Sequence, residues 1–179
     1  MKFNWNDGWL FTKDAKLVSG THGALNVSAW ETVDLPHTWN AKDGQDGGND
    51  YYRGTCYYTK KLALADCKDA EQVYIEFDGA NSSADVYVNG TLAVHHDGGY
   101  STWRVNITEA LEETNLIVVA VDNSANETVY PQMADFTFYG GLYRDVNLIG
   151  VSESHFDLNF FGTHGMKVTP EIEDDDAEV

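Results

Sequence analysis

The sequence predicts an all-β domain, a sandwich of the jelly-roll type with little helix. Short segments that alternate apolar and polar residues recur at spacings of about 10–15 residues from Thr55 onward. Gly and Asn turns separate them, and almost no segment has helical periodicity. The 179 residues are 42% hydrophobic and 13% aromatic, enough to bury the core of one domain with a fragment of a second.

The first 50 residues predict one edge strand and one long loop. The large apolar residues near the start include Trp5, Trp9, Leu10 and Phe11. Trp30, Val33 and Leu35 then alternate with polar residues, which predicts an edge strand ending at Pro36. Residues 41–50 are rich in Gly and Asp and fit no regular element. Loops of that length in compact domains are usually functional or mobile.

The middle of the chain predicts consecutive strands. Residues 55–64 alternate imperfectly, and residues 72–78 place Val73, Ile75 and Phe77 on one face. Asn89-Gly90 lies between two alternating runs, which predicts a hairpin over residues 85–94. A further strand is expected over residues 101–107, with Trp103, Val105 and Ile107 on one face.

The remaining elements follow from shorter patterns. Thr108 is expected to cap a short helical turn over residues 109–113, and the apolar run 116–121 predicts a buried strand. The paired glycines Gly140 and Gly141 permit a sharp backbone turn. A last strand is expected over residues 142–149, with Arg144 and Asp145 inside it.

Composition restricts the partners and the compartment. A net charge of −18 argues against nucleic acid, because a phosphate backbone requires Lys and Arg, and it fits a neutral ligand. The N-terminus shows no signal-peptide pattern and no run is long enough for a membrane helix, so a cytoplasmic protein is expected. Cys56 and Cys67 are then best interpreted as reduced thiols.

Two polar pairs have residue types that suit chemistry, carboxylates for glycoside hydrolysis and histidines for metal binding, but their geometry disfavours both roles. Glu76 and Asp78 lie two residues apart on a strand, so they share a face about 6.5–7 Å apart, as any polar strand face would provide. We interpret them as a solvated or structural face. His95 and His96 are adjacent on a strand and point to opposite faces, so no metal site is predicted. No sequence feature indicates a cofactor site within this chain.

The remaining candidates are side chains that suit a sugar. Asp135 is a lone carboxylate among aromatic residues just before the Gly-Gly turn, and such an acceptor suits sugar hydroxyls; a solvated loop Asp is the alternative. Asn49 and Asp50 can also bond hydroxyls, or serve turn chemistry. Aromatic residues near loops could stack on sugars or fill the core: Trp39, Tyr51, Tyr52, Tyr57 and Tyr100.

Residues 135–146 read Asp-Phe-x-x-Tyr-Gly-Gly-Leu-Tyr-Arg-Asp-Val. This stretch resembles the signature that ends the N-terminal sugar-binding domain of family 2 glycoside hydrolases, the β-galactosidase and β-glucuronidase group. Five earlier stretches resemble the same domain in the same order: residues 35–40, 51–58, 77–80, 85–90 and 98–100. The resemblance covers about residues 3–150; at Tyr57 the chain departs mildly, since relatives often have Trp there.

The resemblance implies a galactose-binding-type jelly roll over residues 1–150 that packs on a later (β/α)8 barrel. Both catalytic glutamates belong to that barrel, so this chain alone is predicted to be inactive and to hold no catalytic residue, metal or cofactor. Asp135 would contact sugar hydroxyls at the active-site rim, with Asn49 and Asp50 in a second loop. Arg144 and Asp145 match positions that suit structural pairing.

The parent would be a retaining β-galactosidase acting on a terminal β-galactoside, and a homo-oligomer is left open as its assembly. An autonomous carbohydrate-binding module and a purely architectural β-sandwich remain the alternatives. Residues 151–179 resemble a linker and the truncated first strand of an immunoglobulin-like second domain. Because such a strand has no sheet to join, residues 162–179 are predicted to be weakly held or to use a partner's edge.

Overall fold

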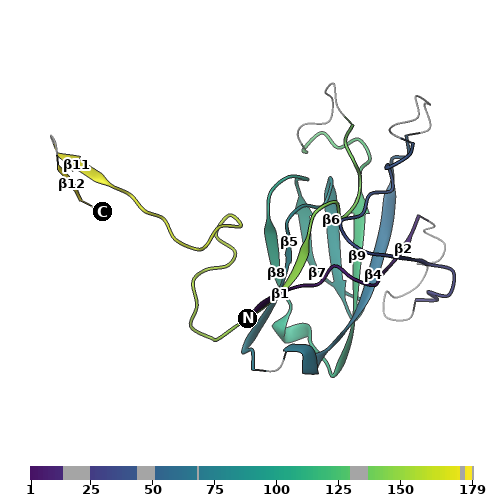
Figure 1. Cartoon of the computed structure of the whole chain (residues 1–179), viewed down its shortest axis with the longest axis horizontal. Coiled ribbons are helices and arrows are strands. Elements are labelled where there is room, and N and C mark those ends of the chain that lie inside the picture. Colours follow the sequence, from purple (N-terminus) through teal and green to yellow (C-terminus); the bar gives the residue numbers. More distant parts are fainter. Residues whose placement is uncertain (14–24, 44–50, 68, 130–136, 174–175, 179) are drawn as a thin grey trace.

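The computed structural model describes residues 1–13, 25–43, 51–67, 69–129, 137–173 and 176–178. Within these ranges the chain forms a sandwich of two antiparallel sheets packed face to face and a separate two-stranded hairpin, with 3₁₀ turns and no α-helix (Figure 1). The predicted all-β sandwich is therefore confirmed.

The smaller sheet has four strands in the order β1-β10-β5-β8. Their bounds are β1 Lys2–Asn4, β5 Gln72–Phe77, β8 Trp103–Asn106 and β10 Val146–Val151. The larger sheet has six strands in the order β3-β2-β4-β9-β6-β7. Their bounds are β2 Trp9–Thr12, β3 Glu31–Val33, β4 Thr55–Ala63, β6 Ser83–Val88, β7 Thr91–Asp97 and β9 Thr114–Asp122. The 3₁₀ turns are η2 (Leu64–Cys67) and η3 (Thr108–Ala110).

The core lies between the sheets and is made of the inward-facing residues that the alternation predicts. Among its fully buried side chains are Tyr58, Leu62, Ile75, Phe77, Val119, Val121 and Leu148. Asn89 and Gly90 both have positive φ (51° and 86°), which matches the type I′ hairpin turn predicted between β6 and β7. β3 forms an edge of the larger sheet, as expected for residues 30–35.

Two local predictions were wrong. Thr108 does not cap a helical turn over 109–113: the turn is η3, which begins at Thr108, and the Thr108 hydroxyl instead accepts the backbone N–H of Val73 (2.9 Å). The side chain of Asn106 accepts the Thr108 N–H (3.0 Å) in the manner of a turn residue. The last strand also begins later than predicted, at Val146, so Arg144 and Asp145 precede it.

Arg144 and Asp145 nevertheless have structural roles. The Asp145 carboxylate accepts the side-chain N–H of Asn6 (2.9 Å), and the Arg144 guanidinium donates to the Tyr100 carbonyl (2.9 Å). The two residues therefore bind neighbouring segments rather than each other.

Glu76 is the most deeply buried carboxylate among the described residues, with 1% of its surface exposed. Its oxygens accept Lys2 Nζ (2.5 Å), Arg104 Nε (2.6 Å) and Asn147 Nδ2 (3.2 Å). Burial alone would raise the pKa of Glu76, but the hydrogen bonds and charges of Lys2 and Arg104 outweigh it and hold the pKa below its usual range. This residue is structural, in agreement with the interpretation from sequence.

The cysteines are buried free thiols, and burial raises the pKa of Cys56 to about 12. No helix among the described residues has the length and apolar character needed to span a membrane.

Residues 152–170 contain no strand, and β11 (Glu171–Glu173) and β12 (Asp176–Glu178) form a hairpin that lies apart from the sandwich (Figure 1). The assignment of 151–179 to a linker and a second domain stays a prediction.

Candidate functional site

The predicted sugar-contacting residues Asp135, Asn49 and Asp50 lie outside the described residues. The structure does describe the chain on both sides of the two segments that carry them. Residues near these segments meet two further asparagines in one hydrogen-bonded network, which we call the asparagine junction: Asn40, Asn81, Asn123, Gly140 and Gly141.

Asn40 is the centre of the junction and is completely buried. Its side-chain oxygen accepts the backbone N–H of Gly140 (2.8 Å) and the side-chain N–H of Asn123 (3.2 Å). Its side-chain nitrogen donates to the Tyr52 carbonyl (3.0 Å) and to the Asp43 carboxylate (3.1 Å). The side-chain amide of Asn40 therefore bonds to Asp43 and Tyr52, which lie on the two sides of residues 44–50. It also bonds to Gly140, which lies four residues after the 130–136 segment.

The other two asparagines complete this arrangement. Asn123, directly after β9, accepts the backbone N–H of Gly54 (2.9 Å) and donates to the Tyr52 carbonyl (3.2 Å). Asn81 donates to the Tyr139 carbonyl (2.9 Å) and forms an isolated antiparallel bridge with Gly141. Because buried polar groups that are fully paired make a segment rigid, the bases of both loops are fixed relative to each other.

The Gly-Gly turn is required by close packing at this junction. A Cβ on Gly140 would overlap the indole of Trp39. A Cβ on Gly141 would lie 2.6 Å from the His37 carbonyl oxygen and 2.7 Å from the Tyr58 hydroxyl, and its φ of +125° is one that other residues rarely adopt. The predicted turn is therefore present, and both of its glycines are needed.

Of the aromatic residues singled out as sugar-stacking candidates, Trp39 belongs to the core, with 6% of its surface exposed, and stacks on Phe11. Tyr52 is half-buried against the same core. Tyr51 and Tyr57 are also half-buried, and Tyr100 is 39% exposed. Core filling therefore accounts for Trp39 and Tyr52, whereas Tyr51, Tyr57 and Tyr100 keep exposed ring surface.

Beneath the junction, the half-buried His37 pairs with the buried Tyr58, with 2.8 Å between Nδ1 and the hydroxyl. Burial lowers the pKa of His37; the charge of Glu31 opposes this shift and the charge of Lys13 reinforces it. Burial raises the pKa of Tyr58 well above its ordinary value. Both groups are therefore neutral near pH 7, and they support the backbone at Gly141 rather than exchange protons.

Asp43 is a residue that sequence reasoning missed. One carboxylate oxygen accepts the N–H of Tyr52 (3.0 Å) as well as that of Asn40, while the other is buried with no hydrogen-bond partner among the described residues. The only local signal is a polar residue three positions after Asn40. Asp43 closes the base of the segment that carries Asn49 and Asp50.

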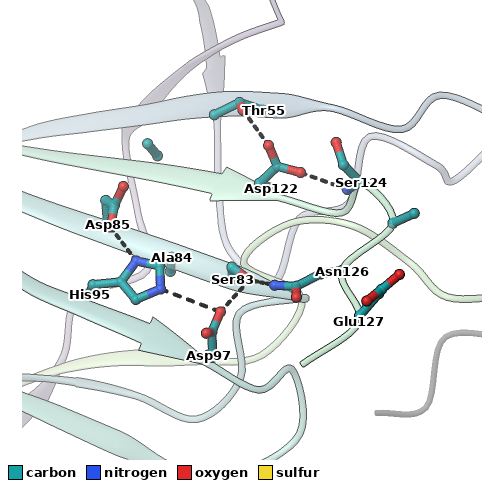
Figure 2. Close-up of a pocket in the computed structure, with 12 residues that line it drawn as sticks. Thr55, Ser83, Ala84, Asp85, His95, Asp97, Asp122, Ser124, Asn126 and Glu127 are labelled. Atoms are coloured by element: carbon teal, nitrogen blue, oxygen red, sulfur yellow. Dashed lines mark hydrogen bonds and ion pairs between the residues drawn. The ribbon is translucent and has the colours of Figure 1, made fainter. Parts of the chain in front are cut away.

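A hollow of about 510 Å³ on the outer face of β4, β9, β6 and β7 gathers the other carboxylates near this end. Figure 2 shows that Asp85, Asp97 and Asp122 are already engaged, whereas Glu127 is drawn without an interaction to the other residues shown. Asp122 accepts the Thr55 hydroxyl and the Ser124 N–H, and Asp97 accepts the Ser83 hydroxyl (2.6 Å). Among the described residues no group of three or more His, Cys, Asp or Glu is arranged to hold a metal ion.

His95 and His96 lie on opposite faces of β7, as their adjacency predicts. His95 is exposed between Asp85 (2.6 Å) and Asp97 (3.4 Å), as Figure 2 shows. His96 is half-buried and stacks on Trp103, with ring centroids 4.5 Å apart.

These environments predict pKa shifts of opposite sign for the two neighbouring histidines. The hydrogen bond to Asp85 raises the pKa of His95 against a small opposing effect of burial, whereas burial lowers the pKa of His96. NMR titration of the ring protons should place His95 above the ordinary value of 6.5 and His96 below it. Protonated His95 therefore stabilises the fold at low pH, a contribution lost as pH rises through its raised pKa.

Asp85→Asn is the matched control for this titration. It should lower the pKa of His95 and affect that of His96 much less, because only His95 is bonded to Asp85 and the charge of His95 is the weakest of the influences on the pKa of His96. Equal pKa values for the two histidines in the parent chain would contradict the assigned environments.

The fold and the junction define a class: a β-sandwich domain in which the described residues that flank two chain segments are joined at one end, an arrangement suited to ligand binding. Residues 25–151 match the family described as "Glycosyl hydrolases family 2, sugar binding domain". The chain belongs to this family.

Individual relatives agree with that assignment. The chain is 36% identical, over 99% of its length, to a putative beta-glucuronidase of Formosa agariphila, and 29% identical, over 98%, to a beta-galactosidase of Thermoanaerobacter pseudethanolicus. It spans 21% and 23% of those two proteins. A solved FMN-binding beta-glucuronidase from Facaelibacterium prausnitzii superposes with a TM-score of 0.81 and 40% identity, over 98% of this chain and 26% of that one.

Proposed function

We propose that this chain is the part of a retaining β-glycosidase that completes the substrate-binding rim, and that Asp135, Asn49 and Asp50 accept hydrogen bonds from the hydroxyls of a terminal sugar. The observation that carries the proposal is the asparagine junction, in which Asn40 joins the flanks of both loop segments. The catalytic barrel that this chain does not contain supplies the two glutamates, as the family resemblance implies.

The contribution of this domain would be orientation of the sugar. A carboxylate that accepts a hydroxyl hydrogen bond is worth roughly 1.5–3 kcal/mol, provided that its position is held. The asparagine junction limits the movement of the loop bases, so less entropy is lost when the sugar is bound in the reactive orientation.

For the sugar itself, the sequence favoured a β-galactoside, and the names of the similar proteins favour a β-glucuronide. Two of the three relatives described above are beta-glucuronidases. The guanidinium of Arg53, 5.4 Å from the Tyr51 ring centroid beside the junction, supplies a cation that suits a uronate. We therefore rank β-glucuronides first and β-galactosides second as substrates of the parent enzyme. The assay should include an aryl β-glucuronide and an aryl β-galactoside.

Asp135→Ala, made in the enzyme that carries the catalytic domain, tests the proposal. Losing one charge-assisted hydrogen bond should lower kcat/KM roughly 10- to 150-fold on the preferred glycoside while the melting temperature stays unchanged. Asp66→Ala is the control, because Asp66 is an exposed carboxylate in η2. Unaltered kinetics in a folded Asp135→Ala enzyme would refute the role, and loss of assembly without loss of kcat/KM would indicate a purely architectural domain.

A further inference from the structure

The segment that follows the sandwich carries a concentration of exposed apolar side chains. Among the described residues, half of the exposed large hydrophobic side chains lie between positions 156 and 168, and each of these is more than half exposed: Phe156, Phe161, Met166 and Val168. The others are spread over the sandwich: Met1, Leu64, Leu92 and Tyr100. Single exposed apolar residues are usual, whereas several in one segment indicate an interaction surface. We call residues 156–168 the apolar segment.

The middle of the apolar segment has a defined position on the sandwich. Arg104 Nη1, in β8, donates to the carbonyls of Leu158 (2.6 Å) and Thr163 (3.0 Å). A Cβ on Gly162 would lie 2.0 Å from the Thr102 carbonyl oxygen, so the two backbones are in close contact. Residues 158–163 are therefore attached to β8 rather than extended into solvent.

Bonds within the segment fix the direction of its most exposed ring. The N–H and hydroxyl of Thr163 both donate to the Phe160 carbonyl (3.0 and 2.6 Å), which closes a turn around Phe161. Phe161 has a φ of +49°, a conformation that is uncommon for a bulky residue, and its side chain is 85% exposed. The turn thus presents an aromatic ring to water at a cost in backbone strain. A ring already held in place loses less entropy when a partner binds it.

The composition of the segment suits a protein surface. Residues 156–168 contain one carboxylate, Asp157, and one lysine, Lys167, in a chain whose net charge is −18. The centres of protein interfaces are likewise poor in charged residues and rich in Phe and Met. The four apolar side chains are too exposed to line a concave site, which a small molecule would require. A broad apolar surface is therefore the partner that fits.

We propose that the apolar segment is a contact between domains, and that it packs on an apolar surface of the rest of the parent polypeptide. This inference rests on the proposed function, in which the chain completes a larger enzyme. The similar proteins match 98–99% of this chain, and the chain spans only 21–26% of them, so most of each relative lies outside the matched part. The segment is also where the chain leaves the sandwich (Figure 1). A second copy of this chain fits less well, because two net charges of −18 repel each other.

Thiol labelling tests the contact, because the chain's own cysteines, Cys56 and Cys67, are buried. Phe161→Cys places a thiol at an exposed position, and its reaction with a maleimide is followed by mass spectrometry of the labelled peptide. The rate should be at least about tenfold lower in the enzyme that carries the catalytic domain than in this chain alone. Leu64→Cys is the matched control, because Leu64 is also an exposed apolar side chain but lies in η2. Its rate should be the same in both proteins.

Phe161→Ser tests whether the contact contributes to stability. The side chain is exposed in this chain, so the urea midpoint of the chain alone should not change. In the enzyme with its catalytic domain the same substitution removes buried apolar area, so the melting temperature should fall by several degrees. Leu64→Ser should change neither quantity.

Equal labelling of Phe161→Cys in the chain alone and in the enzyme would overturn the proposal, as would equal slowing of Leu64→Cys or a Phe161→Ser enzyme as stable as its parent. Labelling of the chain alone that slows as its concentration is raised would assign the surface to a second copy. The result is separate from the role of Asp135: unaltered kinetics of a folded Asp135→Ala enzyme would refute the substrate role and leave the labelling difference in place.

Discussion

Gly141→Ala should destabilise the sandwich by about 2–6 kcal/mol. A φ of +125° costs a residue with a side chain about 1–3 kcal/mol, and forcing a methyl group within 2.6 Å of the His37 carbonyl oxygen adds about 1–3 kcal/mol of overpacking. Domains are typically stable by only about 5–15 kcal/mol, so the urea midpoint should fall by a large fraction. Equilibrium urea unfolding followed by tryptophan fluorescence measures the change.

Gly98→Ala separates backbone strain from crowding. Gly98 has a closely similar φ of +120°, but the nearest atom to an added Cβ would be His96 Nε2 at 3.8 Å. This variant should therefore lose only the strain contribution, about 1–3 kcal/mol. Equal destabilisation of the two variants would contradict the view that the asparagine junction is closely packed around Gly141.

Most of the fold could be predicted because its signals are local. The alternation of Val73, Ile75 and Phe77, the turn at Asn89-Gly90 and the apolar run before Asp122 each determine an element within about ten residues. The errors lie where a tertiary contact decides the outcome. Thr108 has the residue type of a helix cap, but its hydroxyl binds the N–H of Val73 on another strand.

The asparagine junction could not be predicted from sequence. Asn40, Asn81 and Asn123 are separated by about forty residues each, and an asparagine in a loop ordinarily signals a turn. Only the pairing of β4 with β9 brings Gly54 beside Asn123 and lets Asn40 reach Gly140. The Gly140-Gly141 pair could be recognised in the sequence. The groups that exclude a side chain there, which are the Trp39 indole, the His37 carbonyl and the Tyr58 hydroxyl, could not.

The buried charge at Glu76 shows the same limit. Its position two residues from Asp78 indicated a polar strand face, but burial to 1% depends on Lys2 and Arg104, which come from β1 and β8 on other parts of the sheet. Pairs so distant in the chain leave no periodic pattern. Removing one partner of such a buried pair is nevertheless costly, because the remaining charge stays buried.

Arg104→Ala should cost about 3–5 kcal/mol of the free energy of unfolding. Both side chains of the Arg104–Glu76 pair are buried, at 8% and 2% exposure, and removing Arg104 leaves the buried Glu76 carboxylate with only the half-exposed Lys2 as a counter-ion. The variant also loses the bonds to Leu158 and Thr163, so residues 158–163 should exchange amide hydrogens faster. Urea unfolding and hydrogen exchange measure the two effects.

Two further variants identify the cause of the Arg104 effect. Lys2→Ala removes a cation from the same carboxylate, but Lys2 is 55% exposed, so its loss should cost no more than about 1 kcal/mol. The double variant Glu76→Gln, Arg104→Met removes both charges and should recover part of the loss, because the uncompensated charge is then absent.

The pH dependence of the destabilisation distinguishes the charge interaction of Arg104 with Glu76 from the packing of the Arg104 side chain. The pKa of Glu76 is held below its ordinary value in the folded chain, so its contribution to stability is present above the unfolded pKa and is lost as pH falls through the folded one. Arg104→Ala should therefore be most destabilising near neutral pH and progressively less so in acid. A difference between variant and parent that stays constant down to pH 3 would mean that Arg104 acts through packing and carbonyl bonds alone.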